Sequence, residues 1–231
     1  MENHISVDYV FQKLENVPDY VKIPENRVKP WGTAHAIYCA KDKISEDFVI
    51  INADDFYGRD AFMTAGNFLK NSKDTKYSIV GYKAKNTMTN NGSVKRGIII
   101  SDNGNLKTIT ESSLEYIDGK INATPLDQEK SFIIDDDSLV SMNMLTFDKK
   151  IFNYLEQEMN TFFKDNEKML EKCEFLIPNV LQKCVQDGIK VKVLNTNATW
   201  YGVTYREDSD NVKESLKKLV LNGEYPNQLW D

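Results

Sequence analysis

Short apolar runs alternate along the chain with amphipathic segments. Residues 48–53 are apolar at five of six positions without alternation, which is typical of a strand buried on both faces of an α/β sheet. Comparable runs predict strands at 7–12, 77–83, 138–147 and 189–195. Helical periodicity and capping signals predict helices at 34–43, 59–71, 149–164, 173–187 and 209–221. Strands that alternate with helices indicate the α/β class.

Glycine-containing turns predict two hairpins within this pattern. The sequence Asp102-Asn103-Gly104-Asn105 joins strand-like runs at 96–101 and 106–111, and Asp118-Gly119 is the turn of a smaller hairpin at 116–122. No linker, repeat or low-complexity segment divides the chain. We therefore expect residues 1–231 to form a single domain.

Charge, cysteine content and run length narrow the functional classes. The formal net charge is −6, and no basic stripe offsets it, which argues against a nucleic-acid partner. Three cysteines without C-x-x-C spacing favour reduced thiols over a disulfide framework or a zinc site. No apolar run approaches the length of a membrane span, and there is no signal peptide. We expect a cytoplasmic protein with no membrane partner.

Two adjacent carboxylates, Asp54 and Asp55, end the apolar run at 48–53. Ligands of open α/β sheets bind at the carboxyl ends of strands, and carboxylate oxygens suit Mg²⁺. Adjacent strand residues point to opposite faces, so only one of the two can face an ion directly. The alternative is an ordinary turn, since Asp, Asn and Gly are common turn residues.

A second candidate is the segment Gly32-Thr33, which opens the helix-compatible stretch at 34–43. Thr33 is expected to be the N-cap, and Gly32 would let the backbone approach a ligand closely. Free N–H groups at a helix start can bind an acceptor-rich group. The alternative is a simple helix cap after a loop.

Taken together, Gly32-Thr33-Ala34-His35-Ala36 and Asn52-Ala53-Asp54-Asp55 resemble the sugar-phosphate nucleotidyltransferases, the group that includes glucose-1-phosphate uridylyltransferase and thymidylyltransferase. The likeness continues through Ser93-Val94-Lys95-Arg96-Gly97, Ser141-Met142-Asn143, Trp200-Tyr201-Gly202-Val203-Thr204-Tyr205 and Tyr225-Pro226-Asn227-Gln228-Leu229-Trp230. The resemblance implies an incomplete Rossmann-like, doubly wound mixed sheet of the nucleotide-diphospho-sugar transferase type, with β-hairpin insertions.

The resemblance also implies a reaction. A nucleoside triphosphate, with UTP favoured, would react with a sugar 1-phosphate, with glucose 1-phosphate favoured, to give a nucleotide-sugar and pyrophosphate in the presence of Mg²⁺. Asp54 would be the catalytic metal ligand, with Asp55 beside it as a further candidate. Gly32 and Thr33 would lie against the nucleobase, so that Gly32→Val should block uridine nucleotides with little change in melting temperature. Glu111 and Asn143 would bind the sugar phosphate.

Several other polar residues have structural alternatives. His35 is expected to pack or hydrogen bond as a structural side chain. The run Asp135-Asp136-Asp137 is expected to be a solvated turn, not a second metal site. Lys95 or Arg96 could meet a phosphate, and the alternative is a solvated charge on an edge strand.

The chain departs from the family pattern at two places. No glycine precedes Gly32, so nothing near the start matches the family's first strand and its glycine-rich triphosphate loop. Without this loop we expect weak nucleotide binding and low or no turnover. Near the end, Gly202 stands where relatives often carry a metal-binding Asp, which puts a two-metal site in doubt.

A family sheet without its first strands would leave 48–53 with an open edge. The sequence therefore predicts an N-terminally truncated domain that is completed in one of three ways: by a homo-oligomer, by a complementing N-terminal fragment, or by a shift of 7–12 into the gap. Two other functional classes remain, a non-catalytic protein that binds nucleotides or nucleotide-sugars, and a glycosyltransferase of related fold. The absence of D-x-D at Asn52-Ala53-Asp54-Asp55 disfavours the glycosyltransferase.

Overall fold

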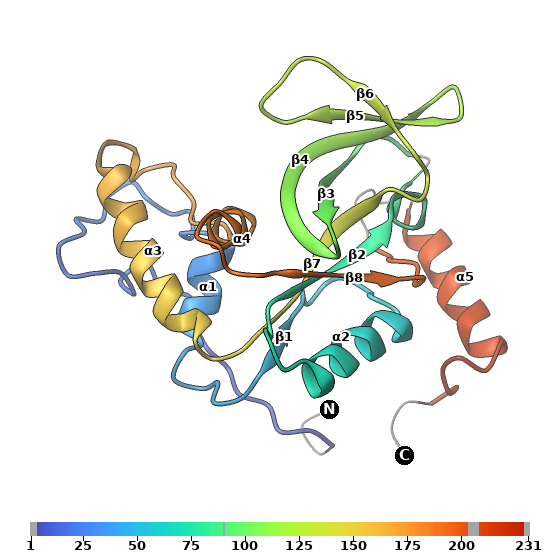
Figure 1. Ribbon diagram of the computed structural model, residues 1–231, viewed down its shortest axis with the longest axis horizontal. Coiled ribbons are helices and arrows are strands. Elements are labelled where there is room, and N and C mark those ends of the chain that lie inside the picture. The colour runs from blue at the N-terminus through green and yellow to red at the C-terminus, as the bar shows by residue number, and fades with distance from the viewer. Residues whose placement is uncertain (1–3, 90, 203–207, 229–231) are drawn as a thin grey trace. The chain divides into compact units, whose positions relative to one another are not determined.

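The computed structural model describes residues 4–89, 91–202 and 208–228. The chain divides into two compact units (Figure 1). We call Met1–Phe48 with Phe147–Ile189 the helical unit, and Val49–Thr146 with Lys190–Asp231 the sheet unit. The single domain expected over 1–231 stays a prediction.

The sheet unit is built on a mixed eight-stranded sheet. Its strands are β1 (Phe48–Ile50), β2 (Ser78–Lys83), β3 (Val94–Asp102), β4 (Asn105–Ile117), β5 (Lys120–Pro125), β6 (Phe132–Ile134), β7 (Leu139–Phe147) and β8 (Lys192–Thr196). They follow the order β1-β7-β2-β8-β4-β5-β6, and β3 pairs with both β4 and β7. β2 runs parallel to β8 and antiparallel to β7. The predicted α/β fold with a mixed sheet is confirmed.

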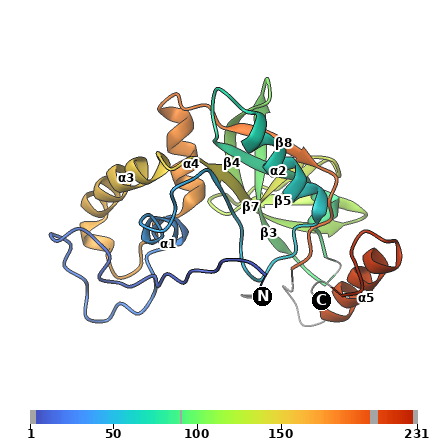
Figure 2. The same cartoon turned by 90° about the horizontal axis from the view of Figure 1, so that it is seen from below.

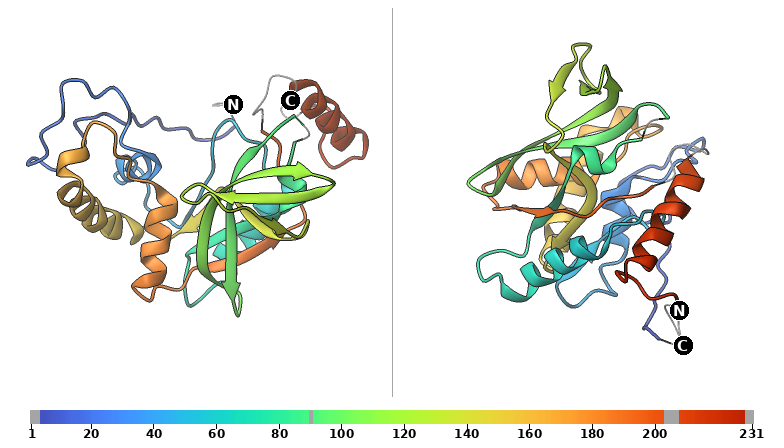
Figure 3. Two further views of the ribbon diagram at one scale, coloured as in Figure 1. Left: turned by 90° about the horizontal axis from the view of Figure 1, so that it is seen from above. Right: turned by 90° about the vertical axis from the view of Figure 1, so that its right-hand side faces the viewer.

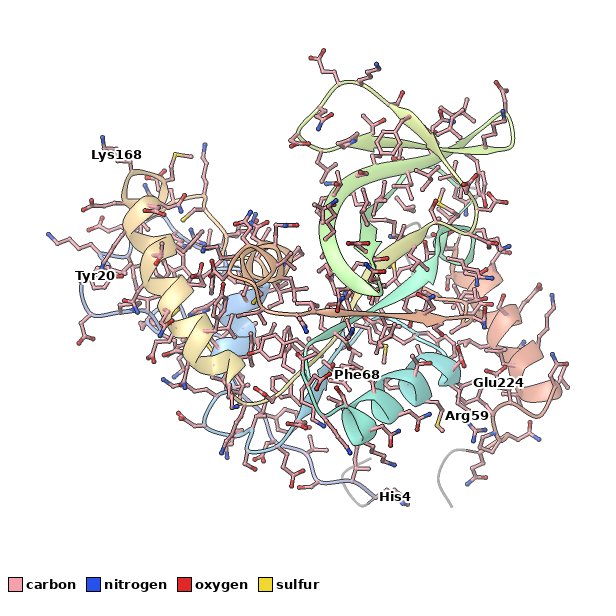
Figure 4. The ribbon with its side chains drawn as sticks, viewed as in Figure 1. His4, Tyr20, Arg59, Phe68, Lys168 and Glu224 are labelled. Atoms are coloured by element: carbon pink, nitrogen blue, oxygen red, sulfur yellow. The ribbon has the colours of Figure 1, made fainter. Side chains whose placement is uncertain are left out.

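Helix α2 (Arg59–Asn71) packs against β2 and β8, as Figures 1 and 4 show. Ala61 and Ala65 lie one turn apart and are fully buried, because their small side chains let the helix approach the sheet closely. They belong to the same apolar core as Val80 of β2. Figure 4 labels Arg59 and Phe68, which mark the two ends of the helix. The 3₁₀ turn η1 (Ala84–Thr87) follows β2, and α5 (Asp208–Leu221) is the last helix.

Two tight turns connect the antiparallel strands of the hairpins seen in Figure 3. Asn103 and Gly104 have φ values of 48° and 72°, and Asp118 and Gly119 have 51° and 75°. Positive φ at both central residues is the conformation that matches the twist of paired strands, and Asn-Gly and Asp-Gly adopt it most readily. Both predicted hairpins are confirmed.

The helical unit contains α1 (Thr33–Cys39), α3 (Ile151–Asp165), the short η2 (Glu167–Met169) and α4 (Ile177–Gln186), shown in Figure 2. Trp31 is fully buried and meets Phe163 edge to face, with ring centroids 4.8 Å apart. The Arg27 guanidinium lies 3.5 Å from the centre of the Trp31 ring, and the Trp31 indole N–H donates to Leu14 O at 2.9 Å. These contacts connect the segment that precedes α1 with helix α3.

Two predicted strands are wrong or too long. Residues 7–12 form no strand, because no strand among the described residues pairs with this segment. Tyr9 and Phe11 are 71% and 75% exposed. The segment therefore does not fill the gap beside β1. β1 itself stops at Ile50, and Ile51 is 42% exposed. As the end strand of the sheet, with β7 as its neighbour, β1 is half-buried and not covered on both faces.

The helix predicted at 173–187 begins later than expected. Pro178 occupies the first turn of α4, where its missing N–H has no cost. The residues before it are extended: Phe175 N–H donates to Trp31 O, and Ala34 N–H donates to Phe175 O at 3.0 Å. This backbone contact holds the start of α1 against the segment that leads into α4.

Candidate functional site

Asp54 and Asp55 follow β1 in the sheet unit and have different surroundings. The Asp55 carboxylate accepts a hydrogen bond from Asn52 Nδ2 at 2.9 Å and lies 3.3 Å from the Tyr57 hydroxyl. Asp54 is exposed and makes no hydrogen bond or ion pair with the described residues. The two neighbours thus divide into one anchored carboxylate and one that is available to a ligand.

Tyr57 connects Asp55 to the middle of β7. Its hydroxyl accepts from the Asn52 backbone N–H at 3.0 Å and lies 2.9 Å from Met142 O, so Met142 O and Asp55 compete for its single proton. The Tyr57 ring is almost fully buried. Tyr57 thereby links the Asp55 carboxylate to the backbone of Met142.

Burial is the largest cause of a raised pKa at Asp55, and the charge of Asp54 adds to it. The hydrogen bonds from Asn52 and Tyr57 act in the opposite direction. Arg96 lies near enough for the Asp55 charge to act on its guanidinium, although burial prevails and lowers the pKa of Arg96 to about 10. Trp200 Nε1 is buried without a hydrogen bond to the described residues, yet lies close enough to Asp55 to lower the pKa of its carboxyl.

We expect Asp55→Asn to raise the melting temperature at pH 7 by a few degrees. A folded-state pKa above the unfolded value of 3.8 means that the folded protein binds more protons between the two values, so stability falls as pH rises through this window. The amide introduced by Asp55→Asn does not ionise, so folding carries no free-energy cost of burying a charge at this position. Thermal melts from pH 7 downward should show the advantage shrinking towards pH 3.8. An advantage that grows on acidification would contradict the assignment.

Gly97 of β3 lies between β4 and β7 in the same unit and is closely packed. Gly97 lies opposite Glu111 on β4 and opposite Ser141 on β7. A Cβ atom at Gly97 would be 2.8 Å from Glu111 Oε1 and 2.7 Å from a methyl carbon of Ile109. Ile109 and Glu111 therefore already fill the space that a side chain at Gly97 would occupy, and only glycine fits between these strands.

Asn143 lies on an irregular part of β7, two residues after Ser141. The register between β2 and β7 shifts between Ile79 and Gly81, and Asn143 has a φ of 60°. Among the described residues, the other non-glycine residues with positive φ lie in hairpin turns. A left-handed residue within a strand is strained, and such strain clusters at functional sites. The Asn143 backbone N–H donates to Ser141 Oγ at 3.2 Å.

Glu111 has a raised pKa because neighbouring atoms displace water from its carboxylate, although the residue as a whole is exposed. Four predicted residues thus lie in the sheet unit: Asp54, Asp55, Glu111 and Asn143. The sequence reading had no signal for the buried Tyr57 that joins two of them.

Gly202 packs against Trp200. A Cβ atom at Gly202 would lie 2.1 Å from the Trp200 ring. A carboxylate at this position would require the indole to move. Phe56 and Tyr201 exchange backbone hydrogen bonds of 2.8 and 3.0 Å, which place this segment beside the residues that follow Asp55. Val203-Thr204-Tyr205 and Leu229-Trp230 lie outside the described residues.

The predicted nucleobase segment lies in the helical unit. Gly32 has φ 108° and ψ 176° and is itself the N-cap of α1, so the prediction that Thr33 is the N-cap is wrong. Thr33 lies inside the helix, and its hydroxyl oxygen accepts from the Ile177 N–H at 3.1 Å. The reason is local: only glycine adopts the backbone conformation at 32 that starts the helix one residue earlier.

Three other expectations can be compared with the structure. His35 is fully buried and hydrogen-bonded, as expected of a structural side chain. Asp135-Asp136-Asp137 precedes β7 in a turn, where Asp137 pairs with Lys83 and Lys85. Arg96 is not a solvated charge: it is buried, and its Nε donates to Thr87 Oγ1 at 3.2 Å.

Asp54 and Asp55 supply too few ligands for a metal ion that is coordinated by protein side chains alone, but they suit Mg²⁺. No group of three His, Cys, Asp or Glu residues in the described part of the chain could hold a metal ion. Mg²⁺ commonly takes one or two carboxylates and completes its shell with water and substrate phosphates. Within the described residues, no helix has the length and hydropathy that a membrane crossing requires.

Comparison with known proteins agrees with this architecture. Among solved structures, the inositol-1-phosphate CTP transferase from T. maritima aligns with a TM-score of 0.52 at 17% identity, covering 82% of this chain and 63% of that one. A Bacillus anthracis protein assigned as a glucose-1-phosphate thymidylyltransferase aligns with a TM-score of 0.50 at 13% identity, covering 80% and 60%. The chain thus spans about three fifths of these proteins, and the likeness shows the fold.

Family assignment rests on the sequence. No curated protein matches the chain significantly. The sequence model of one family, described as nucleotidyl transferase, matches residues 2–203, which is most of the chain. The protein therefore belongs to the nucleotidyl transferase family.

Proposed function

We propose that the chain is the sugar-phosphate and metal-binding part of an enzyme that joins a nucleoside triphosphate, UTP by preference, to a sugar 1-phosphate. The products would be a nucleotide-sugar and pyrophosphate. The observation that carries the proposal is that Tyr57 links the strand-ending carboxylate of Asp55 to Met142 of β7, directly before the left-handed Asn143. Family membership supports the same class of reaction.

The attacking group in this reaction is a phosphate oxygen that is already ionised, so the protein needs no general base. Catalysis then consists of positioning and of neutralising charge at the α-phosphate. Asp54, with Asp55 as second candidate, would hold Mg²⁺, which when bound acts as a Lewis acid on phosphate oxygens. Glu111 and Asn143 would bind the sugar phosphate, and Gly32 and Thr33 would lie against the base.

We further propose that β1 receives a strand from another polypeptide, either a second copy or an N-terminal fragment that also carries a glycine-rich phosphate loop. The support is the position of β1 at the end of the sheet and the exposure of Ile51 beyond it. An apolar edge with free backbone groups favours pairing with another chain. Light scattering should show a mass above that of one chain. A stable monomer that does not aggregate would contradict this part of the proposal.

A pyrophosphate-release assay across the four nucleoside triphosphates and several sugar 1-phosphates tests the reaction. It should be run with and without a peptide that supplies a strand and a glycine-rich loop. We expect Mg²⁺-dependent release that increases with the peptide and is greatest with UTP. Binding of nucleotide-sugars without any release would instead support the non-catalytic alternative. If the chain neither binds nucleotide-sugars nor releases pyrophosphate, both the enzymatic function and the non-catalytic alternative are contradicted.

A further inference from the structure

A cavity of about 330 Å³ in the sheet unit is lined by other residues than those proposed to bind the substrates. Residues of η1, β3, β4 and α5 line it, together with the segment around Trp200. Asp54, Asp55, Glu111 and Asn143 are not among them. The volume is close to the lower end of the range for small-molecule sites, which suits a ligand of about one sugar ring.

Arg96 lines this cavity from one face of β3. Neighbouring residues of a strand point to opposite faces, and the Glu111 carboxylate packs against Gly97. The Arg96 side chain therefore leaves β3 on the face that the Glu111 carboxylate does not occupy. There its guanidinium lies over Trp200, with the guanidinium carbon 4.6 Å from the centre of the ring. The cavity is thus a different site from the one proposed for the sugar phosphate.

The charge of Arg96 has no ion-pair partner among the described residues, although the side chain is only 6% exposed. A guanidinium has five N–H groups, and three of them donate: to Thr87 Oγ1, to Thr87 O and to Lys95 O. Two N–H groups have no acceptor in the described part of the chain. The buried Trp200 indole N–H has none there either. Buried cations are normally paired, so this place favours an anion that accepts from these N–H groups.

The other charged residues that line the cavity have partners. Lys85 pairs with Asp137 at 2.9 Å. The Asp208 carboxylate accepts from Thr89 Oγ1 at 2.6 Å. Burial lowers the pKa of Arg96 to about 10, so its guanidinium is still charged at pH 7. Arg96 is therefore the cation of this cavity that a ligand can neutralise.

Much of the remaining lining combines aromatic residues with small polar ones. Aromatic rings cover the apolar face of a sugar, and hydroxyl and amide groups pair with its hydroxyls. Asn211 and Ser215 are four residues apart in α5 and lie on one face of the helix. The lining includes Tyr116, Trp200, Tyr201, Thr87, Asn211 and Ser215.

We propose that this cavity binds an acidic monosaccharide, whose carboxylate or phosphate accepts from Arg96 while its ring packs against the aromatic residues of the lining. The guanidinium fork matches the oxygen atoms of both oxyanions. Binding here needs no metal ion, in contrast to the site proposed at Asp54. It also does not depend on the reaction proposed for the chain.

Calorimetric titrations of the whole chain in EDTA test the proposal, because without Mg²⁺ no cation can bridge a ligand to Asp54. The probes are glucuronate, glucose 6-phosphate, glucose and inorganic phosphate. We expect one or both acidic sugars to bind about tenfold or more tightly than glucose and inorganic phosphate. The tighter of the two identifies the oxyanion as a carboxylate or as a phosphate. Equal affinities for all four probes, or no binding of either acidic sugar, would overturn the proposal.

Arg96→Met keeps a long side chain without a charge, so it should reduce the affinity for the tighter acidic sugar to that for glucose. Lys95→Met is the matched control. It removes the same charge from the neighbouring exposed residue, whose side chain points to the other face of β3, and it should leave the affinity unchanged. A preference for the acidic sugar that survives in folded Arg96→Met, or that Lys95→Met loses equally, would overturn the role of Arg96.

A second measurement uses the unaltered chain, because Arg96→Met also removes hydrogen bonds to Thr87 and Lys95 that support the fold. The chain has three tryptophans, and the Trp200 indole N–H signal is the one that Trp200→Phe removes from the ¹⁵N NMR spectrum. A saturating acidic sugar should shift this signal. It should leave the signal of Trp31, whose N–H donates to Leu14 O in the helical unit, in place. A Trp200 signal that does not move at saturation would overturn the proposal.

Discussion

Replacing Gly32 by alanine is expected to destabilise the protein by about 3 kcal/mol or more, which corresponds to a fall in melting temperature of roughly 6–12 °C. A Cβ atom at this position would lie 2.5 Å from the backbone oxygen of Phe175 and 2.9 Å from its backbone carbon and nitrogen. Backbone atoms cannot move aside as a flexible side chain can. The φ of 108° adds strain that every residue except glycine must bear.

This corrects the expectation that Gly32→Val would block uridine nucleotides with little change in melting temperature. The space at Gly32 is filled by Phe175, so bulk there acts first on the fold. Gly66→Ala is the matched control, because a Cβ atom at Gly66 in α2 would meet nothing within 4 Å. The control should stabilise the protein by about 0.5–1 kcal/mol. Equal melting temperatures for the two variants would contradict the close approach at Gly32.

Asp54→Asn is expected to weaken Mg²⁺-dependent binding of UTP by about 100-fold or more, since a metal ligand contributes several kcal/mol to holding charged phosphate oxygens. The fold should survive. Asp54 is exposed and makes no hydrogen bond or ion pair with the described residues, so the melting temperature should remain close to that of the unaltered protein. Calorimetric titration with UTP in Mg²⁺ and in EDTA measures the effect.

Asp135→Asn provides the control for Asp54→Asn. It removes the same charge from another exposed position of the sheet unit, in the turn before β7. It should leave the titration unchanged. If both variants lose affinity equally, the effect comes from net charge and Asp54 is not a metal ligand.

Elements specified by local sequence could be predicted from the sequence. The helix expected at 59–71 matches α2 at both ends, because its apolar face and its boundaries depend on neighbouring residues. The turns at Asn103-Gly104 and Asp118-Gly119 are likewise set by the residues that occupy them. The segment at 7–12 shows the limit of such reasoning. Its composition is that of a strand, but a strand exists only where another strand pairs with it.

The candidate site likewise contains features that local sequence predicts and contacts that it does not. Asp54 and Asp55 could be found because carboxylates that end an apolar run are visible in one stretch of sequence. The bond between Tyr57 and Met142 could not, since its two ends are 85 residues apart. The same holds for Gln12, which reaches Gly32 across 20 residues. A polar residue in a strand-like run carries no sign of its distant partner.

Binding of a nucleotide-sugar to the unaltered chain tests the central claim most directly. The account predicts that UDP-glucose, titrated by calorimetry, binds in Mg²⁺ and binds much more weakly in EDTA, because the diphosphate is held through a metal at Asp54. A panel with other bases and sugars would then define the preferred ligand. If the folded chain bound no member of the panel in Mg²⁺, or bound each equally well in EDTA, the claim would be contradicted.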